Sequence, residues 1–246
     1  DKMTLYKHVI SLGWFCSVAE EIEKLGLRSA SYPFDWILTD WKTVEEIMKG
    51  EFADYLKSDK LIQDAEVSNM YHHSDRKCLV YVHDIDPYEN YEKQIEKAQM
   101  KYARRLTRLR HDICEPCIFL RYIQDEEEYR YIVKKHNEIS SWLQGFNPEN
   151  QIVYIANKEL GQPDFIWSVE KDNQDTVARN FLDQLPGLKK WLLSQQYDFL
   201  IESNLKWYRR KIIRKKWHRF FEKVRHGIRR LERQLKKQMQ NGGKQK

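Results

Sequence analysis

Short apolar runs of β character alternate with amphipathic helical patterns along most of the chain. Three of these runs have the length of buried strands, at 6–12, 117–123 and 151–157. Helical patterns with an apolar stripe follow or separate them, at 17–26, 88–111, 125–143 and 188–200. This alternation is typical of βαβ units, so it predicts an α/β fold. We expect a mainly parallel sheet flanked by helices, in the manner of a Rossmann-like sandwich.

The segment between the first two apolar runs has a different character. Residues 66–71 and 78–83 favour two strands around the polar stretch HHSDRK, which predicts a hairpin. The stretch SYPFDW reads as a loop, because Pro33 disfavours helix at Tyr32. A short helix is expected from Thr39 or Asp40 onwards.

The C-terminal segment carries a heptad stripe. Its apolar members are spaced alternately by four and three residues: Trp217, Phe221, Val224, Ile228, Leu231 and Leu235. The other faces of this predicted helix are rich in Arg and Lys. The chain is therefore expected to contain an α/β domain at 1–205, a basic amphipathic helix at 206–240 and a disordered tail at 241–246.

Charge separates these two parts of the chain. Residues 206–246 contain 17 Lys and Arg but only two acids, whereas residues 1–205 contain 26 basic and 35 acidic side chains. An acidic body disfavours nucleic acid as the partner. A basic amphipathic helix suits an anionic membrane surface, which predicts a cytoplasmic protein peripheral to the inner membrane. The expected membrane-binding residues are Arg214, Lys215, Lys216, Trp217, Phe220 and Phe221. Docking of the helix on the acidic body, or pairing with a second copy as a homodimer, are the alternatives.

Several classes of protein are disfavoured by what the sequence lacks. No run approaches the 18 or so apolar residues of a spanning helix, and the N-terminus lacks a signal-peptide pattern. No glycine-rich phosphate loop is present, so no nucleotide cofactor is expected. The stretch HDICEPC offers one C-x-x-C pair and a histidine, fewer than the four ligands of structural zinc, so no metal is expected. The four cysteines fit a reducing, cytosolic setting.

Cys16 is the first candidate for chemistry. It follows a strand and Gly13 and lies where a helix begins. The positive end of the helix macrodipole lowers a thiol pKa, and the free N–H groups there are able to hold an oxyanion. The alternative is a small buried hydrophobic residue, which is a common role for a free cysteine.

A cysteine nucleophile needs a base, and His83 is the best candidate because it ends a predicted strand beside Asp84. His72 and His73 are the alternatives, and a surface histidine among acidic loop residues is the structural interpretation. Asp35 lies between Phe34 and Trp36, an unusual place for a carboxylate. It is a candidate to cap a helix, orient a histidine or bind a substrate hydroxyl, or it belongs to a structural turn.

The N-terminal stretch SLGWFCSVAEEIEKLGLRSASYPFDWI resembles the signature of a bacterial family of unknown function that is labelled papain-like cysteine peptidase. The pattern is S-L-G-x-x-C-x-x-A, a helix ending near G-L-R, and S-x-P-F-D-W, here from Ser11 to Trp36. A strand ending in His83-Asp84, the arginines Arg104, Arg105 and Arg108, and Arg121 also fit. The resemblance implies Cys16 as nucleophile and His83 as base. The third member stays open between Asp84, which we prefer, and Asp86, Asp35 and Asn157.

The same resemblance carries a second hypothesis. Members of this family are similar to proteins encoded among surface-polysaccharide enzymes, which suits a membrane-associated glycosyltransferase that uses a sugar nucleotide. Phosphates would then be held by Arg104, Arg108 and Arg121. Asp35 and Trp36 are the other expected substrate-binding residues. The preferred function is a cysteine-nucleophile hydrolase or acyl transferase that acts on a peptide or glycan. The third hypothesis is a non-catalytic module that brings the acidic body to a membrane.

Overall fold

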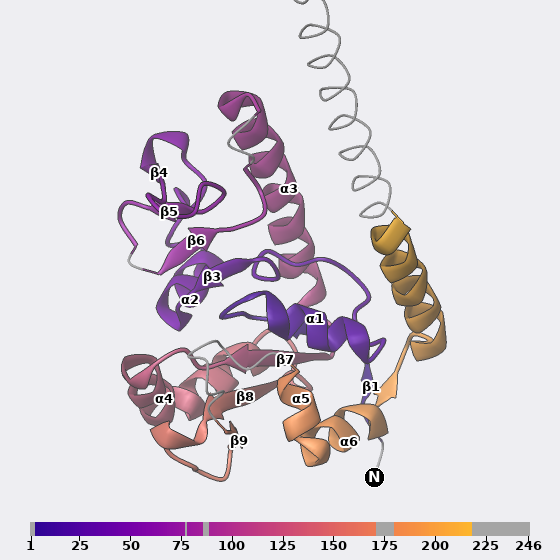
Figure 1. Cartoon of the computed structure of the whole chain (residues 1–246). Helices are drawn as coiled ribbons and strands as arrows, with labels where there is room; N and C mark the ends of the chain where they lie inside the picture. The colour runs from indigo at the N-terminus through magenta and orange to yellow at the C-terminus, as the bar shows by residue number, and fades with distance from the viewer. Residues whose placement is uncertain (1–2, 77, 86–88, 171–179, 218–246) are drawn as a thin grey trace, which may run out of the picture. The chain divides into compact units, whose positions relative to one another are not determined.

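The three apolar runs form neighbouring strands of one parallel sheet in the computed structural model (Figure 1). They are β2 (His8–Ser11), β7 (Cys117–Tyr122) and β8 (Gln151–Asn157), and β9 (Ile166–Val169) adds a fourth strand. The order is β2-β7-β8-β9, with every pair parallel. The structure describes residues 3–76, 78–85, 89–170 and 180–217. The chain divides into two units, Asp1–Asn204 and Leu205–Lys246, and the sheet belongs to the first.

Both faces of the parallel sheet are buried, which explains why its strands read as continuous apolar runs. Ile118 and Leu120 face an apolar cluster that includes side chains of α1 (Cys16–Lys24), α5 (Phe181–Gln184) and α6 (Pro186–Ser194). Phe119, between them, faces the other cluster, with side chains of α3 (Tyr91–Asp112) and α4 (Glu126–Gln144). Alternate residues of one strand thus point to opposite helical layers.

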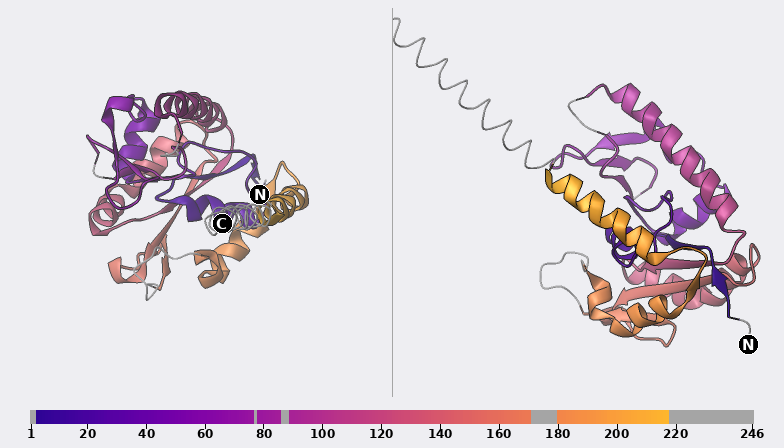
Figure 2. Two further views of the ribbon diagram at one scale, coloured as in Figure 1. Left: turned by 45° about the horizontal axis from the view of Figure 1, so that its top comes forward. Right: turned by 90° about the vertical axis from the view of Figure 1, so that its right-hand side faces the viewer.

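A second, antiparallel sheet lies between β2 and β7 in the chain. Its order is β3 (Ile37–Thr39), β6 (Leu79–Tyr81), β5 (Tyr71–His73) and β4 (Leu61–Gln63). The predicted hairpin corresponds to β5 and β6, although β5 begins only at Tyr71. The helix α3 packs against this sheet, with the Tyr81 and Tyr102 rings 5.9 Å apart, and Figures 1 and 2 show the two side by side. The fold is therefore mixed α/β, with parallel and antiparallel sheets. The finer Rossmann-like assignment stays a prediction.

Helix caps fall close to where the sequence places them. Asp40 caps α2 (Trp41–Lys49) by accepting from the Thr43 N–H, and Asn90 and Asp125 cap α3 and α4 in the same way. The N-cap of α1 is Phe15, and Pro186 begins α6. The remaining elements are β1 (Leu5–Tyr6), β10 (Gln196–Tyr197) and the 3₁₀ turns η1 (Ser58–Lys60) and η2 (Lys158–Leu160).

The second unit is helical over its described part, 205–217. Trp207, Ile213 and Trp217 are each more than half exposed on it. The predicted contacts Phe220 and Phe221, and the tail at 241–246, lie outside the described residues. Among the described helices, none is both long and apolar enough to cross a bilayer.

Candidate active site

The structure brings Cys16 and His83 together, although 67 positions separate them in the chain. The Cys16 Sγ lies 3.5 Å from the His83 Nε2, within hydrogen-bond reach for sulfur. Cys16 is half-buried and His83 is exposed, so the pair is open to solvent. The thiol and the imidazole are thus arranged as a nucleophile and a base would be.

Cys16 is presented by a tight turn between β2 and α1. Gly13 adopts a positive φ of 83°, and the helix begins at Cys16 itself. Phe15 provides no side-chain cap, and the first turn contains no acidic residue. The N–H groups at this helix start therefore point to where a negative charge would be stabilised by the macrodipole.

The buried side chain of Arg121 holds this turn in place through hydrogen bonds to the backbone beside it. Its side chain is fully buried, donates to both carboxylate oxygens of Glu128 at 2.7 Å, and also donates to the Leu12 and Thr39 carbonyls. A Cβ on Gly13 would lie 3.1 Å from the Arg121 Nη1, so a side chain there would require the guanidinium to shift. Burial raises the pKa of Glu128, and Arg121 opposes that rise. The structure thus corrects the expected role of Arg121 as a phosphate ligand, because the guanidinium is occupied by an internal ion pair.

His83 comes from the antiparallel sheet. Ile37 of β3 pairs with Tyr81 of β6, so the residue before Ile37 lies close to the residues that follow Tyr81. As a result the Trp36 ring meets the His83 ring edge-on, with centroids 6.2 Å apart. The Thr39 N–H also donates to the Trp14 carbonyl, at 3.0 Å. This bond joins β3 to the turn that carries the cysteine.

Asp35 supports Trp36 from inside the protein. It is 1% exposed and accepts from the Arg28 guanidinium at 2.6 Å and from the Tyr32 N–H at 2.9 Å. Burial raises the pKa of this carboxyl, and Arg28 opposes the rise. The Arg28 Cζ lies 5.4 Å from the centre of the Trp36 ring. The buried Asp35 is therefore a positioning residue within its turn, and Trp36 lies half-buried beside His83.

Asp84, the preferred third catalytic residue, makes its hydrogen bonds to side chains of α3. One carboxylate oxygen pairs with Lys101, and the other accepts from the Tyr102 hydroxyl at 2.8 Å. Among the described residues, no hydrogen bond joins it to His83. Asp84 instead anchors the loop that carries His83 to α3. Of the other candidates, Asn157 caps η2 and Asp86 lies outside the described residues.

The arginines of α3 differ in their surroundings. Arg104 is exposed, whereas Arg108 donates to the Ser31 carbonyl at 2.8 Å. Arg108 therefore ties the SYPFDW turn to the helix, and its expected role as a phosphate ligand stays a prediction. Arg105, one of the three arginines that fit the family pattern, is buried on the same helix. Its signal in the sequence is its place in the apolar stripe of α3, between Tyr102 and Leu109.

The alternative histidines are engaged in other contacts, and two of the other cysteines have raised pKa values. His72 pairs with Asp64 at 2.7 Å, and the buried His73 lies 3.0 Å from the Asp54 carbonyl oxygen. Burial raises the pKa of Cys78 to about 12 and also raises that of Cys117. Cys78 lies in the wall of a cavity of about 280 Å³ beside Glu128. Raised thiol pKa values make Cys78 and Cys117 poor nucleophiles at neutral pH.

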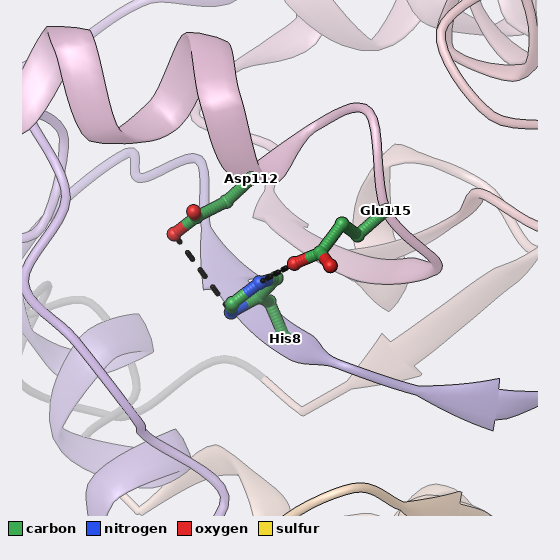
Figure 3. A group of neighbouring side chains, drawn as sticks. All are labelled: His8, Asp112 and Glu115. Carbon is green, nitrogen blue, oxygen red and sulfur yellow. Dashed lines mark hydrogen bonds and ion pairs between the residues drawn. The ribbon is translucent and has the colours of Figure 1, made fainter.

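A histidine and two carboxylates gather at the amino end of β2, whereas Cys16 follows the carboxyl end of that strand (Figure 3). The His8 Nε2 lies 2.9 Å from Glu115, and the His8 Nδ1 lies 3.8 Å from Asp112. The two ring nitrogens thus face different acids, and the Tyr32 hydroxyl donates to Asp112. A single ion binds only one nitrogen of an imidazole, and structural zinc takes four ligands. The group fits a hydrogen-bond network better than a metal site.

Comparison with known proteins gives one family match. A family model described as "Putative papain-like cysteine peptidase (DUF1796)" matches residues 7–158. The chain belongs to this family. The match includes Cys16, His83 and the parallel strands β2, β7 and β8, which gives coarse support for a cysteine hydrolase. No curated protein and no solved structure matches the chain significantly. None of the comparisons supports the glycosyltransferase alternative.

Proposed function

We propose that the protein is a cysteine-nucleophile hydrolase or acyl transferase, with Cys16 as nucleophile and His83 as general base. The observation that carries this proposal is the 3.5 Å separation of the Cys16 Sγ and the His83 Nε2 at a helix start without a side-chain cap. The same pairing of a nucleophile with a base recurs on unrelated folds, so it does not depend on one architecture. Membership of the cysteine peptidase family supports the same reaction class.

The reaction follows from these positions. His83 takes the thiol proton, and the Cys16 sulfur attacks the carbonyl carbon of a peptide, amide or ester. The oxyanion that forms is stabilised by N–H groups at the start of α1. His83 then returns the proton to the leaving group as the carbon–nitrogen or carbon–oxygen bond breaks, leaving a thioester on Cys16. Water hydrolyses this thioester, or another nucleophile accepts the acyl group.

Thiol alkylation tests the pair without knowledge of the substrate. Iodoacetamide should label Cys16 with a pH midpoint well below the value of about 8.5 for a free cysteine, because the helix start and His83 favour the thiolate. His83→Ala should slow labelling at pH 6.5 by about tenfold or more. The matched control is His72→Ala, which removes a histidine that pairs with Asp64 away from the site. An ordinary midpoint at Cys16, or equal rates in the two histidine variants, argues against the proposal.

Turnover provides the second arm of the test. A panel of p-nitrophenyl esters should be hydrolysed by the wild-type protein, and Cys16→Ala should remove that hydrolysis. Hydrolysis that survives Cys16→Ala would show that another group performs the reaction.

We further propose that the basic helix contacts an anionic membrane surface at the cytoplasmic face of the inner membrane. The support is the exposure of Trp207, Ile213 and Trp217 among Arg and Lys side chains. Aromatic side chains prefer the interfacial region, and each basic residue near an anionic surface adds about 1 kcal/mol. The same membrane contact would also serve a non-catalytic protein whose basic helix brings the acidic body to the membrane.

Flotation with liposomes tests this contact. The full chain should float with vesicles that contain phosphatidylglycerol and remain behind with vesicles of phosphatidylcholine alone. Deletion of 206–246 should remove the binding. A truncated protein that still floats would place the contact elsewhere, and a second copy as the partner would appear as a dimer in light scattering.

A further inference from the structure

Arg105 is a buried cation that the fold leaves without an anion. It is 9% exposed, and its buried Nη1 has no hydrogen-bond partner. No carboxylate among the described residues forms an ion pair with Arg105. Its recorded contact is with the Tyr102 ring, whose centre lies 5.4 Å from the Arg105 Cζ.

An unpaired buried charge is costly, so its presence needs a reason. Transfer of a charged group from water into a protein costs several kcal/mol unless it is paired and hydrogen-bonded. The burial of Arg105 lowers the pKa of its guanidinium, which reflects the same cost. Contact with one tyrosine ring offsets only a part of this cost. Arg121, by contrast, is fully buried but makes four hydrogen bonds, two of them to the carboxylate of Glu128.

The position of Arg105 links it to the Cys16–His83 site. Lys101, Arg105 and Arg108 lie four and three residues apart, so they share one face of α3. Lys101 at one end holds Asp84, beside His83, and Arg108 at the other end holds the Ser31 carbonyl, at the start of the SYPFDW turn. Arg105 lies between these two anchors.

The neighbouring carboxylates are already committed to other cations. Asp84 pairs with Lys101 and accepts from Tyr102. Asp35 is within electrostatic range of Arg105, but its hydrogen bonds go to Arg28 and to the Tyr32 N–H. One positive charge therefore remains uncompensated between the loop that carries His83 and the turn that carries Trp36.

We infer that Arg105 binds an anionic oxygen group, a carboxylate or a phosphate, on the substrate of the Cys16–His83 site. The planar guanidinium suits the paired oxygens of these groups, and a largely dry setting strengthens the contact. This inference rests on the proposed function and adds the class of substrate, which is an acyl compound with an acidic group near its scissile carbonyl.

Thermal unfolding in different anions tests the site independently of catalysis. At matched ionic strength, sodium phosphate or acetate should raise the Tm of the wild-type protein by about 2–4 °C over sodium chloride. Arg105→Met should lose this rise. Phosphate and acetate are separate arms, and the larger rise identifies the preferred group. The control is Arg110→Met, which removes the same charge from an exposed position of α3 and should keep the rise.

The Tm of Arg105→Met in chloride separates a binding role from a structural one. Replacement of an unpaired buried charge by an apolar side chain of similar size should leave the Tm unchanged or raise it. A fall of several degrees shows that Arg105 is a structural residue and overturns the inference. Absence of an anion-dependent rise in the wild-type protein overturns it as well.

A pair of alkylating reagents connects the anion site to the thiol. Iodoacetate carries a carboxylate and iodoacetamide does not, so the ratio of their rates at Cys16 reports attraction of the anion. Arg105→Met should lower this ratio by about three- to tenfold while the iodoacetamide rate stays the same. An unchanged ratio overturns the assignment of Arg105 to the substrate. A slow iodoacetamide rate in every variant would instead contradict the proposed function, and the anion-dependent Tm would still be read on the Cys16→Ala protein.

Discussion

The protein buries two arginines, Arg121 and Arg105, and their surroundings differ completely. Arg121 is 0% exposed and donates to Glu128 and to two carbonyls that belong to separate segments. Arg105 is 9% exposed and has neither an ion pair nor a hydrogen bond among the described residues. The first joins the cysteine turn to the antiparallel sheet, and the second lies on α3 between Lys101, which holds Asp84, and Arg108, which holds the Ser31 carbonyl.

The difference shows how to tell a structural charge from a binding one. Arg121 is fully buried and has four of its five N–H donors engaged within the protein, so it has little to offer a ligand. A buried cation with unused donors is costly until an anion arrives.

The Arg121–Glu128 pair should dominate stability. Arg121→Met leaves Glu128 buried without its partner and two carbonyls without their donor, so the free energy of unfolding should fall by about 3–5 kcal/mol. Urea unfolding measures this loss. Arg121→Met combined with Glu128→Leu should recover a large part of it, because no unpaired charge then remains. If Arg121→Met lowers the free energy of unfolding only slightly, Arg121 lacks the structural role that distinguishes it from Arg105.

The close approach of Arg121 to Gly13 should contribute nearly as much to the free energy of unfolding. Gly13→Ala places a methyl group 3.1 Å from the Arg121 Nη1 and also strains a positive φ. We expect a loss of about 2–3 kcal/mol in urea unfolding. Gly50→Ala is the matched control, because Gly50 has a similar φ of 78° but a Cβ there would meet its nearest atom only at 3.9 Å. Equal losses in the two variants would mean that contact with Arg121 contributes nothing.

The contact of Trp36 with His83 should affect reactivity more than stability. Trp36→Leu removes the ring that meets the imidazole edge and leaves the Asp35–Arg28 pair in place. We expect the rate of Cys16 alkylation at pH 6.5 to fall by about three- to tenfold, because His83 is then less well positioned. The variant should keep the wild-type Tm within about 2–4 °C. An unchanged rate would show that Trp36 has no role in positioning His83.

Cys78 should show the smallest effect, since it lies beside the satisfied Arg121–Glu128 pair. Its pKa, raised to about 12 by burial, keeps the thiol protonated at neutral pH. The fraction of thiolate therefore stays below about one in a hundred up to pH 9 or so, and alkylation should be negligible there. Mass spectrometry after iodoacetamide treatment at pH 7–9 distinguishes the two cysteines. Labelling of Cys78 at the rate of Cys16 would contradict this assignment.

Much of the fold could be predicted because its signals are local. The strands β7 and β8 and the caps Asp40 and Asp125 follow from apolar runs and from side chains that accept first-turn N–H groups. The antiparallel sheet was predicted only in part, because β3 and β4 are three residues long and have no clear alternation. Short strands depend on their partners more than on their own sequence.

The sequence by itself determined the Gly13 turn, the helix that begins beside Cys16 and the charge of each α3 arginine. Only the tertiary structure decided which histidine reaches the thiol, since His83 arrives through the pairing of β3 with β6. It also decided which arginine is satisfied, assigning Arg121 to Glu128, Arg108 to a carbonyl, and no anion to Arg105. The physical reason is that helix starts and turns depend on neighbouring residues, whereas the partner of a buried charge depends on which distant segments meet around it.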